Sequence, residues 1–208
     1  MIVSQQQRNE QARTFFGKDS ALLLLLAVAV FGLTYFSTVN TASSDPRFTL
    51  LVSQSIIENQ AIKLDHYEQL LGAHHRLNGN YRVKKIGGHY YYYYPLATSL
   101  ISVPFVWVAN LAGRNMTIEN DELAAQNLIS AILSALIVVL LYLICRCYAE
   151  PAAAFSIAGV SFLGSSLIST LGTALWSTDT FVLFNALGLW YIARFEQDRI
   201  KQLNPYYL

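Results

Sequence analysis

Residues 21–36 have the sequence ALLLLLAVAVFGLTYF, and this stretch decides the fold of the chain. No charged side chain occurs between Asp19 and Asp45. A helix needs roughly 20 apolar residues to cross a hydrocarbon layer about 30 Å thick. A cleaved signal sequence is the alternative, but its apolar part is usually only about 7–15 residues long. We therefore predict a retained membrane helix over about 20–39, with Asp45 as the first charge beyond it.

The composition agrees with a membrane protein. Of the 208 residues, 54% are hydrophobic and 13% are charged, whereas a soluble domain usually carries about 25% charged residues. The formal net charge of +1 gives no reason to expect binding to nucleic acid. We expect a multi-pass protein of a bacterial inner or plasma membrane.

Positive charges indicate which later apolar stretches cross the membrane. Such stretches occupy 96–112, 123–145, 151–178 and 180–193. Basic residues precede the first span, so the N-terminus is predicted to be cytoplasmic. The cations Arg146, Arg194, Arg199 and Lys201 fall on that same side only if 96–112 does not cross. We therefore predict that 96–112 lies in the outer membrane interface.

The predicted fold is all-α and integral to the membrane, with four transmembrane helices at about 20–39, 123–145, 153–172 and 177–194. Residues 1–19 and 196–208 form cytoplasmic tails around a membrane domain, 20–195. Residues 40–122 form a long outer loop that carries membrane-lying amphipathic helices. The chain stops after four spans, which is expected of a truncated or split product.

The outer loop opens with SSDPRF and continues as a predicted helix. Apolar residues recur at helical spacing over 47–62, with polar residues between them. Asp45 is placed to cap this helix and Pro46 suits its first turn. The capping explanation needs no function, so it competes with a catalytic role for Asp45.

A basic and aromatic cluster follows in the outer loop. It contains Arg82, Lys84, Lys85 and His89, and then five consecutive tyrosines that end in Tyr93 and Tyr94 before Pro95. Aromatic faces beside ammonium groups suit a sugar ring and a phosphate. Anchoring of these side chains at the membrane interface is the alternative interpretation.

A second aspartate, Asp179, opens the last predicted span on the same outer side as Asp45. Ionisable residues at the edge of a span usually face a cavity, a partner or an ion. If the first and fourth helices pack together, Asp45 and Asp179 provide oxygen ligands for one divalent cation (Mg, Mn or Zn). Capping of the helix by Ser177 and Asp179 is the structural alternative.

The order of these features resembles the N-terminal part of a polytopic glycosyltransferase of the GT-C fold, the class that includes polyprenyl-phosphate-sugar-dependent mannosyltransferases. The resemblance covers most of 20–195. It rests on SSDPRF after the first helix, the long outer loop, HYYYYYPLATSLISVP, and LGTALWSTDTFVLFNALGLW. The chain departs from this class where Pro46 and Arg47 follow Asp45 without a second acid.

The resemblance implies transfer of a sugar from a lipid-linked donor to an acceptor on the outer side of the membrane, as in cell-envelope synthesis. It implies that Asp45 is the catalytic residue and that Asp45 and Asp179 bind a metal. Binding of the substrate is implied for Arg82, Lys84, Lys85, His89, Tyr93 and Tyr94. The partners implied are the donor, membrane lipids and the remainder of a split glycosyltransferase.

A non-catalytic membrane scaffold or assembly subunit is the alternative function. A transporter is less favoured, because the polar residues of the predicted spans are mostly Ser and Thr. An intramembrane hydrolase is also less favoured, since all four histidines lie in the outer loop.

Overall fold

The computed structural model of this chain describes residues 5–37, 45–74, 81–171 and 173–203, with side chains from 19–36, 45–71, 81–171 and 173–197. The fold is mainly helical. The elements run α1 (Gln5–Ser37), α2 (Thr49–Asn59), η1 (Asp65–Tyr67), α3 (Glu68–His74), β1 (Val83–Ile86), β2 (His89–Tyr92), α4 (Ala97–Leu111), α5 (Glu119–Arg146), α6 (Pro151–Leu163), α7 (Ser166–Leu171) and α8 (Ser177–Leu203).

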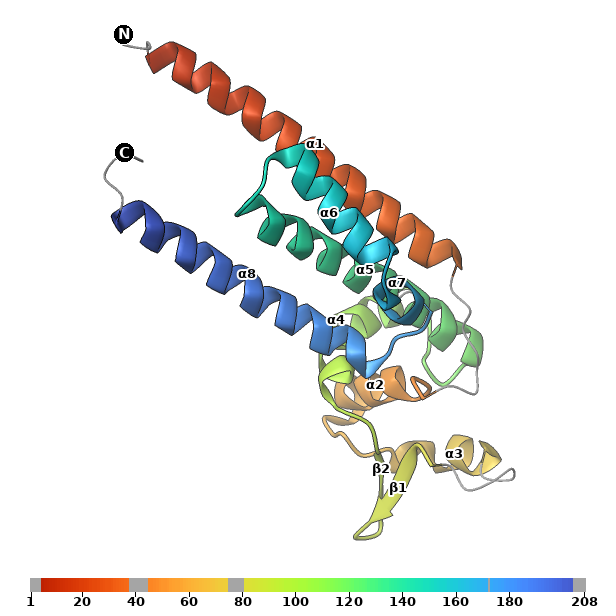
Figure 1. Cartoon of the computed structure of the whole chain (residues 1–208). Coiled ribbons are helices and arrows are strands. Elements are labelled where there is room, and N and C mark those ends of the chain that lie inside the picture. The colour runs from red at the N-terminus through yellow and green to blue at the C-terminus, as the bar shows by residue number, and fades with distance from the viewer. Residues whose placement is uncertain (1–4, 38–44, 75–80, 172, 204–208) are drawn as a thin grey trace.

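Long helices form a bundle, and the outer-loop elements gather at one end of it. Helix α5 packs against α1, α6 and α8, and α1 also contacts α6. The N-terminal end of α1 and the C-terminal end of α8 lie at one end of the bundle, while α2, α3 and the hairpin of β1 and β2 lie at the other (Figure 1). The chain thus runs the length of the bundle in α1, returns in α5, and repeats this in α6–α7 and α8.

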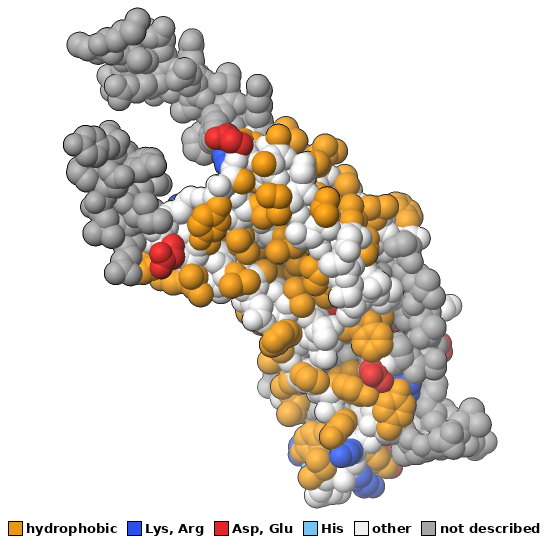
Figure 2. All heavy atoms as spheres, viewed as in Figure 1, with side chains coloured by type: hydrophobic (Ala, Val, Ile, Leu, Met, Phe, Trp, Pro, Cys, Tyr) orange, Lys and Arg blue, Asp and Glu red, His pale blue; other side chains and the backbone are white. Residues whose placement is uncertain are grey.

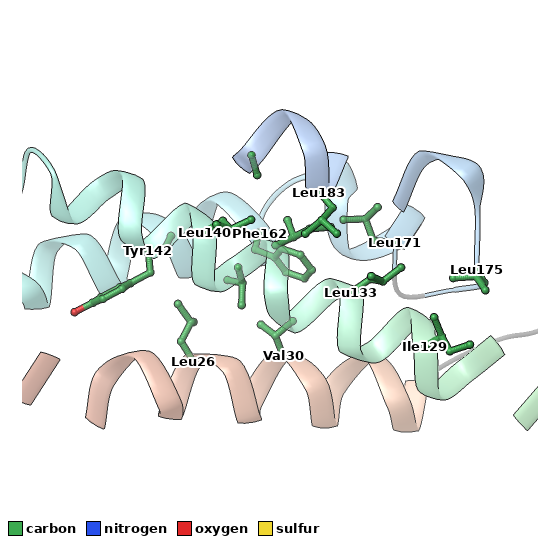
Figure 3. Packing of buried hydrophobic residues seen from close by; sticks show 14 of the residues in the cluster. Leu26, Val30, Ile129, Leu133, Leu140, Tyr142, Phe162, Leu171, Leu175 and Leu183 are labelled. Carbon is green, nitrogen blue, oxygen red and sulfur yellow. The ribbon is translucent and has the colours of Figure 1, made fainter. Parts of the chain in front are cut away.

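The main hydrophobic core lies between these long helices. Leu26 and Val30 of α1 face Leu133 of α5 and Phe162 of α6, and all four side chains are buried (Figure 3). Gly159 of α6 lies beside Leu26 of α1, where an added Cβ would make an ordinary van der Waals contact of 3.8 Å with Leu26 Cδ1.

The outward faces of the bundle are apolar. Hydrophobic side chains cover much of the face in Figure 2, and Lys and Arg appear near the hairpin end. The most exposed large apolar residues include Leu24, Leu25, Phe36, Val160, Phe181, Tyr191 and Ile192. By length and composition, Asp19–Phe36 and Glu119–Arg146 can cross a membrane.

The predicted third span is broken. The sequence predicts one helix over 153–172, but α6 ends at Leu163 and α7 starts at Ser166. Gly164 lies at the break, and a Cβ there would come within 2.7 Å of the Val160 carbonyl oxygen. A glycine is therefore required at this bend, and the sequence pattern of apolar residues carries no sign of it.

The outer loop differs from the prediction in two ways. The helix within 47–62 exists as α2, but its residues 49–55 are buried on every side, so it is not an amphipathic helix on a surface. Gln54, expected on the polar face, accepts a hydrogen bond from the backbone N–H of Met116 at 2.9 Å. The loop also contains β-structure, whereas the sequence predicts an all-α fold.

That β-structure is a two-stranded antiparallel hairpin. Lys84 pairs with Tyr91 and Lys85 with Tyr90, so the basic strand lies against the tyrosine strand. Gly87 and Gly88 form the two-residue turn with φ of 59° and 87°, as a type I′ turn requires. A second, smaller hydrophobic cluster packs the hairpin against α2 and α3, and it includes Phe48, Leu51, Leu64, Leu71 and Val83.

Candidate functional site

The site is built on the turn of residues 45–48, which connects the region after α1 to α2. Phe48 has a left-handed backbone with φ of 76°, a conformation that is costly for a bulky residue. Its N–H donates to Glu122 Oε1 at 2.8 Å, and Glu122 is buried. Because a buried N–H must find an acceptor, Glu122 stabilises the strained turn.

Two more side chains of α5 hold the same turn. Glu119 forms an ion pair with Arg47 at 3.1 Å, and the Gln126 amide donates to the Pro46 carbonyl at 3.4 Å. Glu119, Glu122 and Gln126 are spaced three and four residues apart, so they lie on one face of the helix. We call these three residues the α5 clamp.

Asp45 does not cap α2. No side chain caps that helix, and its N-terminal flanking residue is Phe48. The Asp45 carboxylate instead accepts a hydrogen bond from the Tyr81 hydroxyl at 2.8 Å. The capping explanation for this residue is therefore wrong, and the carboxylate is turned toward the tyrosines of the outer loop.

Tyr92 fixes the backbone of Asp45. The Tyr92 hydroxyl donates to the Asp45 carbonyl at 2.9 Å and lies 2.8 Å from Thr49 Oγ1. Strand β2, which contains Tyr92, is thus linked by this hydrogen bond to the first turn of α2. The turn that bears Asp45 is held by the α5 clamp on one side and by the hairpin on the other.

A small cavity of about 50 Å³ lies beside Asp45. Its wall consists of Asp45, Pro46, Thr49, Tyr92, Tyr94, Pro95, Thr98, Trp176 and Ser177. The α4 and α8 sides of this wall are joined by a buried contact of 2.9 Å between the hydroxyls of Thr98 and Thr180. Since one water occupies about 30 Å³ in the liquid, the cavity admits a hydroxyl group but not a whole sugar ring.

The tyrosines at Asp45 are poor acids. Burial, followed by the hydrogen bond to Asp45, raises the pKa of Tyr94 to about 12. The pKa of Tyr81 is also raised, chiefly by its hydrogen bond to Asp45, and burial raises the pKa of Tyr92. At neutral pH these three hydroxyls therefore remain protonated. Those of Tyr81 and Tyr94 are donors to the Asp45 carboxylate, and that of Tyr92 is a donor to the Asp45 carbonyl.

The basic residues of the hairpin lie over tyrosine rings. The Lys84 ammonium is 3.8 Å from the ring centre of Tyr93, and the Lys85 ammonium is 4.7 Å from that of Tyr90. The Arg82 guanidinium stacks over Tyr81, 4.5 Å from its ring centre, and Tyr81 is the residue bound to Asp45. The two lysines are exposed, so they can also reach an anion outside the hairpin.

His89 has a structural contact. Its Nδ1 is 2.7 Å from Asp65 Oδ2, and Asp65 Oδ1 accepts the backbone N–H of Tyr90 at 2.7 Å. The Tyr90 N–H, and then His89, lower the pKa of Asp65. These contacts tie the hairpin to η1, and neither His89 nor Asp65 lines the cavity at Asp45.

The structure places the predicted site residues in three locations. Asp45 and Tyr94 line the cavity, and the basic residues, His89 and Tyr93 belong to the hairpin region beside it. Asp179 is fully buried in the first turn of α8 and is absent from the cavity wall. Its Oδ2 lies 3.4 Å from Ser130 Oγ, and its Oδ1 has no hydrogen-bond partner among the described residues.

The predicted metal pair is not assembled in the cavity. In the part of the chain that the structure describes, no group of three His, Cys, Asp or Glu side chains is arranged to hold a metal ion. The Asp45 carboxylate faces tyrosine hydroxyls instead of a second carboxylate. These contacts do not fit a cation shared by Asp45 and Asp179, so we derive no step through a metal.

Several site residues are not predicted from the sequence, namely Tyr81, Tyr92, Thr98, Glu122 and Trp176. Only Tyr92 has a local signal, since alternate residues of the tyrosine run must face opposite sides of a strand. The others reach the site through contacts with distant parts of the chain. No family model, curated protein or solved structure matches this chain.

Proposed function

We propose that this chain is a glycosyltransferase, or the N-terminal part of one, that transfers a sugar from a polyprenyl-phosphate donor to an acceptor hydroxyl. The observation that carries the proposal is the position of Asp45. Its carboxylate does not cap a helix but borders a cavity lined by aromatic and hydroxyl-bearing side chains. Arg82 lies over the ring of Tyr81, which is bonded to Asp45, and Lys84 lies over the ring of Tyr93, which packs edge-on against Tyr94 of the cavity wall.

The chemistry assigns a separate task to each group. The acceptor hydroxyl enters the cavity and passes its proton to the Asp45 carboxylate as its oxygen attacks the anomeric carbon of the donor. The bond from that carbon to the phosphate oxygen breaks, and the polyprenyl phosphate leaves with the electron pair. Lys84, Lys85 and Arg82 stabilise the negative charge of the leaving phosphate.

The size of the cavity constrains how the substrates bind. Since its volume is about 50 Å³, only the reacting hydroxyl enters. The sugar ring then lies outside, against the exposed ring of Tyr93, which is 59% accessible. A wider site would be completed by further helices, as expected if a second part of the enzyme packs against the apolar face of α8.

We further propose that α1, α5, α6–α7 and α8 cross the membrane, with the hairpin on the outer side. The apolar outer surface of the bundle supports this arrangement, as does the position of the N-terminal end of α1 and the C-terminal end of α8 at one end (Figures 1 and 2). Helix α4 packs against α2, which belongs to the hairpin end. This contact agrees with a helix that stays at the outer interface.

A scaffold or assembly subunit is the second candidate, and one observation favours it. Helix α8 exposes several large apolar side chains, including Phe181, Phe184, Tyr191 and Phe195. Lipid or a partner protein must cover such a face. If binding of a partner protein were the only function of the chain, substitution of Asp45 would leave that function unchanged.

Asp45→Asn in the full gene product tests the transferase. The amide cannot accept the proton of the acceptor, so we expect sugar transfer to fall by about 10²–10⁴-fold. Glu150→Gln, at an exposed site beside the N-terminus of α6, removes one negative charge at the other end and serves as the control. Unchanged turnover of Asp45→Asn, together with normal folding, would remove Asp45 from the mechanism and favour the scaffold.

Metal dependence remains a prediction of the family resemblance. Incubation of the enzyme with a chelator, followed by assay with and without added Mg²⁺ or Mn²⁺, tests it directly. If the chelator abolishes transfer and added metal restores it, residues other than Asp45 and Asp179 must also bind the metal.

A further inference from the structure

A second, larger cavity lies at the opposite end of the bundle from Asp45, where α1, α5 and α8 meet. Its volume is about 360 Å³. The side chains that matter here are Asp19, Tyr142, Arg146, Trp190, Arg194 and Gln197. None of them belongs to the site around Asp45, and the proposed transfer reaction has no use for them.

One wall of this cavity is a fixed ion pair. Arg146 donates through Nε to Asp19 Oδ1 and through a terminal nitrogen to Asp19 Oδ2, both at 2.8 Å. The Tyr142 hydroxyl donates to Asp19 Oδ1 at 2.6 Å, and Arg146 also binds the carbonyl oxygen of Ala149 at 2.6 Å. The charge of Asp19 is thus neutralised, and both of its oxygens are occupied.

The opposite wall adds a positive charge. Arg194 of α8 lines the cavity and is exposed. Asp19, Tyr142, Arg146, Cys147 and Arg194 are the titratable groups in the described lining. With Asp19 paired to Arg146, the guanidinium of Arg194 leaves this lining with one net positive charge.

The surroundings of the cavity are those of a membrane interface. Trp190 lies between the apolar bundle and the charged end of α8, as tryptophan does in aromatic belts. Leu24 and Leu25 of α1 and Leu189 and Ile192 of α8 are exposed nearby in the sequence. An anion bound at Arg194 would therefore have acyl-chain surface beside it.

We propose that this cavity binds the phosphate of an anionic phospholipid headgroup, with Arg194 as the main electrostatic contact and Trp190 at the glycerol level. Basic pockets between transmembrane helices on the cytoplasmic side bind such headgroups. The site is distinct from that of the sugar donor, which lies at the hairpin end. It depends on the membrane placement proposed above but not on transferase chemistry.

Quenching of Trp190 fluorescence by brominated lipid tests the site. The full chain, with Trp107→Phe and Trp176→Phe so that only Trp190 emits, is placed in nanodiscs. Brominated phosphatidylglycerol and brominated phosphatidylcholine with the same acyl chains are titrated separately. We expect half-maximal quenching at about fivefold lower mole fraction of phosphatidylglycerol. The wild-type chain and its circular dichroism are measured alongside, to show that the two substitutions leave the fold intact.

Arg194→Gln should remove this preference, whereas Lys85→Gln, an equal change of charge on the hairpin, should leave it intact. Inorganic phosphate at tens of millimolar distinguishes the source of the anion. A preference that persists in phosphate supports a lipid site, and one that is abolished shows a free-phosphate site and overturns the proposal. Equal quenching by both lipids, or a preference that survives Arg194→Gln, also overturns it. None of these readouts depends on sugar transfer, so they fail or succeed independently of the transferase.

Discussion

The carboxylate of Asp45 and the main chain of Asp45 are held by different residues. Tyr81 binds the carboxylate, whereas Tyr92 and the α5 clamp hold the neighbouring backbone. The side chain is therefore free to meet a substrate without loosening the turn. A base that is positioned by its backbone keeps its geometry when its own proton is gained or lost.

The strained backbone at Phe48 makes Glu122 the most sensitive residue of the α5 clamp. We expect Glu122→Ala to lower the free energy of unfolding by about 1–3 kcal/mol, because it leaves the Phe48 N–H buried without an acceptor. Glu122→Gln keeps an acceptor oxygen and should cost less. Denaturant unfolding followed by circular dichroism measures both changes.

Glu119→Gln is the matched control for the α5 clamp. Glu119 lies on the same helix face and is 46% exposed, whereas its partner Arg47 is buried. The amide of Glu119→Gln keeps an oxygen that accepts a hydrogen bond from Arg47, so this change should cost less than Glu122→Ala. If Glu119→Gln destabilises the protein as much as Glu122→Ala, the bond to the Phe48 N–H is not the feature that secures the turn.

The raised pKa of Tyr94 predicts a pH dependence. Its value of about 12 exceeds the value of about 10 for a tyrosine in an unfolded chain. The folded state therefore binds the proton more tightly, so this contribution to stability is complete below about pH 10 and is lost as the pH rises toward 12. The difference in absorbance at 295 nm between wild type and Tyr94→Phe measures this titration.

Asp45→Asn provides the check on the cause of that titration. The Asp45 carboxylate helps to raise the pKa of Tyr94, so the amide should shift the titration to lower pH. A Tyr94 titration near pH 10 in the wild type, or no response to Asp45→Asn, would contradict the contact between the two side chains.

At the scale of single residues, the sequence predicts the place of Asp45 but not its contacts. Its position after the first apolar stretch is a local property, and the structure puts it beside a cavity. The bonds from Tyr81, 36 residues away, and from Glu122 to Phe48, 74 residues apart, depend on tertiary packing. Spacing rules for helices and turns reach only a few residues, so they cannot predict such pairs.

Among the elements, the hairpin is one that the sequence does not predict correctly. Gly87–Gly88 between a basic run and a tyrosine run is a turn signal for two paired strands, but the surrounding apolar pattern indicates helices. The tyrosine run suggests interface anchors or a sugar-binding surface, while in the structure Tyr90 and Tyr92 also pack against the smaller hydrophobic cluster. Propensity for β-structure, stronger for tyrosine than for most residues, outweighs the helical context.

Glycine substitutions test the hairpin as an element. Gly88 has φ of 87°, and no atom lies within 4 Å of the position that a Cβ would take, so Gly88→Ala should cost about 1–2 kcal/mol of backbone strain alone. We expect faster hydrogen exchange of the amides in β1 and β2. Gly32→Ala is the control, because Gly32 lies within α1 with equally open space and alanine favours a helix. Equal exchange in both variants would contradict the left-handed turn.

The helices of the bundle are predicted more successfully than their ends. The apolar runs indicate α1, α5 and α8, and among the described helices α1 and α5 are long and apolar enough to cross a membrane. The division between α6 and α7 depends instead on the space around Gly164. A hydropathy window averages over such a break, so only packing reveals it.

At the scale of the whole molecule, the proposed path with four membrane crossings predicts which residues lie on each side of the membrane. In a chain without its native cysteines, Ile86→Cys on the hairpin and Glu196→Cys on α8 are both at exposed positions. A membrane-impermeant maleimide should label residue 86 in intact cells and residue 196 only after lysis. The cysteine-free chain is the blank.

Labelling of both residues in intact cells would show that α4 also crosses the membrane. The positive charges near the end of α8 would then lie outside, against their usual distribution. Labelling of residue 196 but not of residue 86 in intact cells would place the hairpin in the cytoplasm and invert the proposed orientation.

The central position of α5 has a consequence for biosynthesis. Glu122 in its first turns accepts a hydrogen bond from Phe48, and Arg146 in its last turn binds Asp19. The contacts that hold α1 and residues 45–48 therefore form only after α5 has been synthesised. Asp19 and Arg146 are 127 residues apart, and at about 5–20 residues per second their synthesis is separated by roughly 6–25 seconds. During that interval Asp19 lacks its ion pair with Arg146, and the turn at Phe48 lacks its acceptor on Glu122. In the proposed membrane arrangement, α1 must therefore remain available for packing until α5 has been synthesised, and a pause in translation before residue 119 would prolong this state.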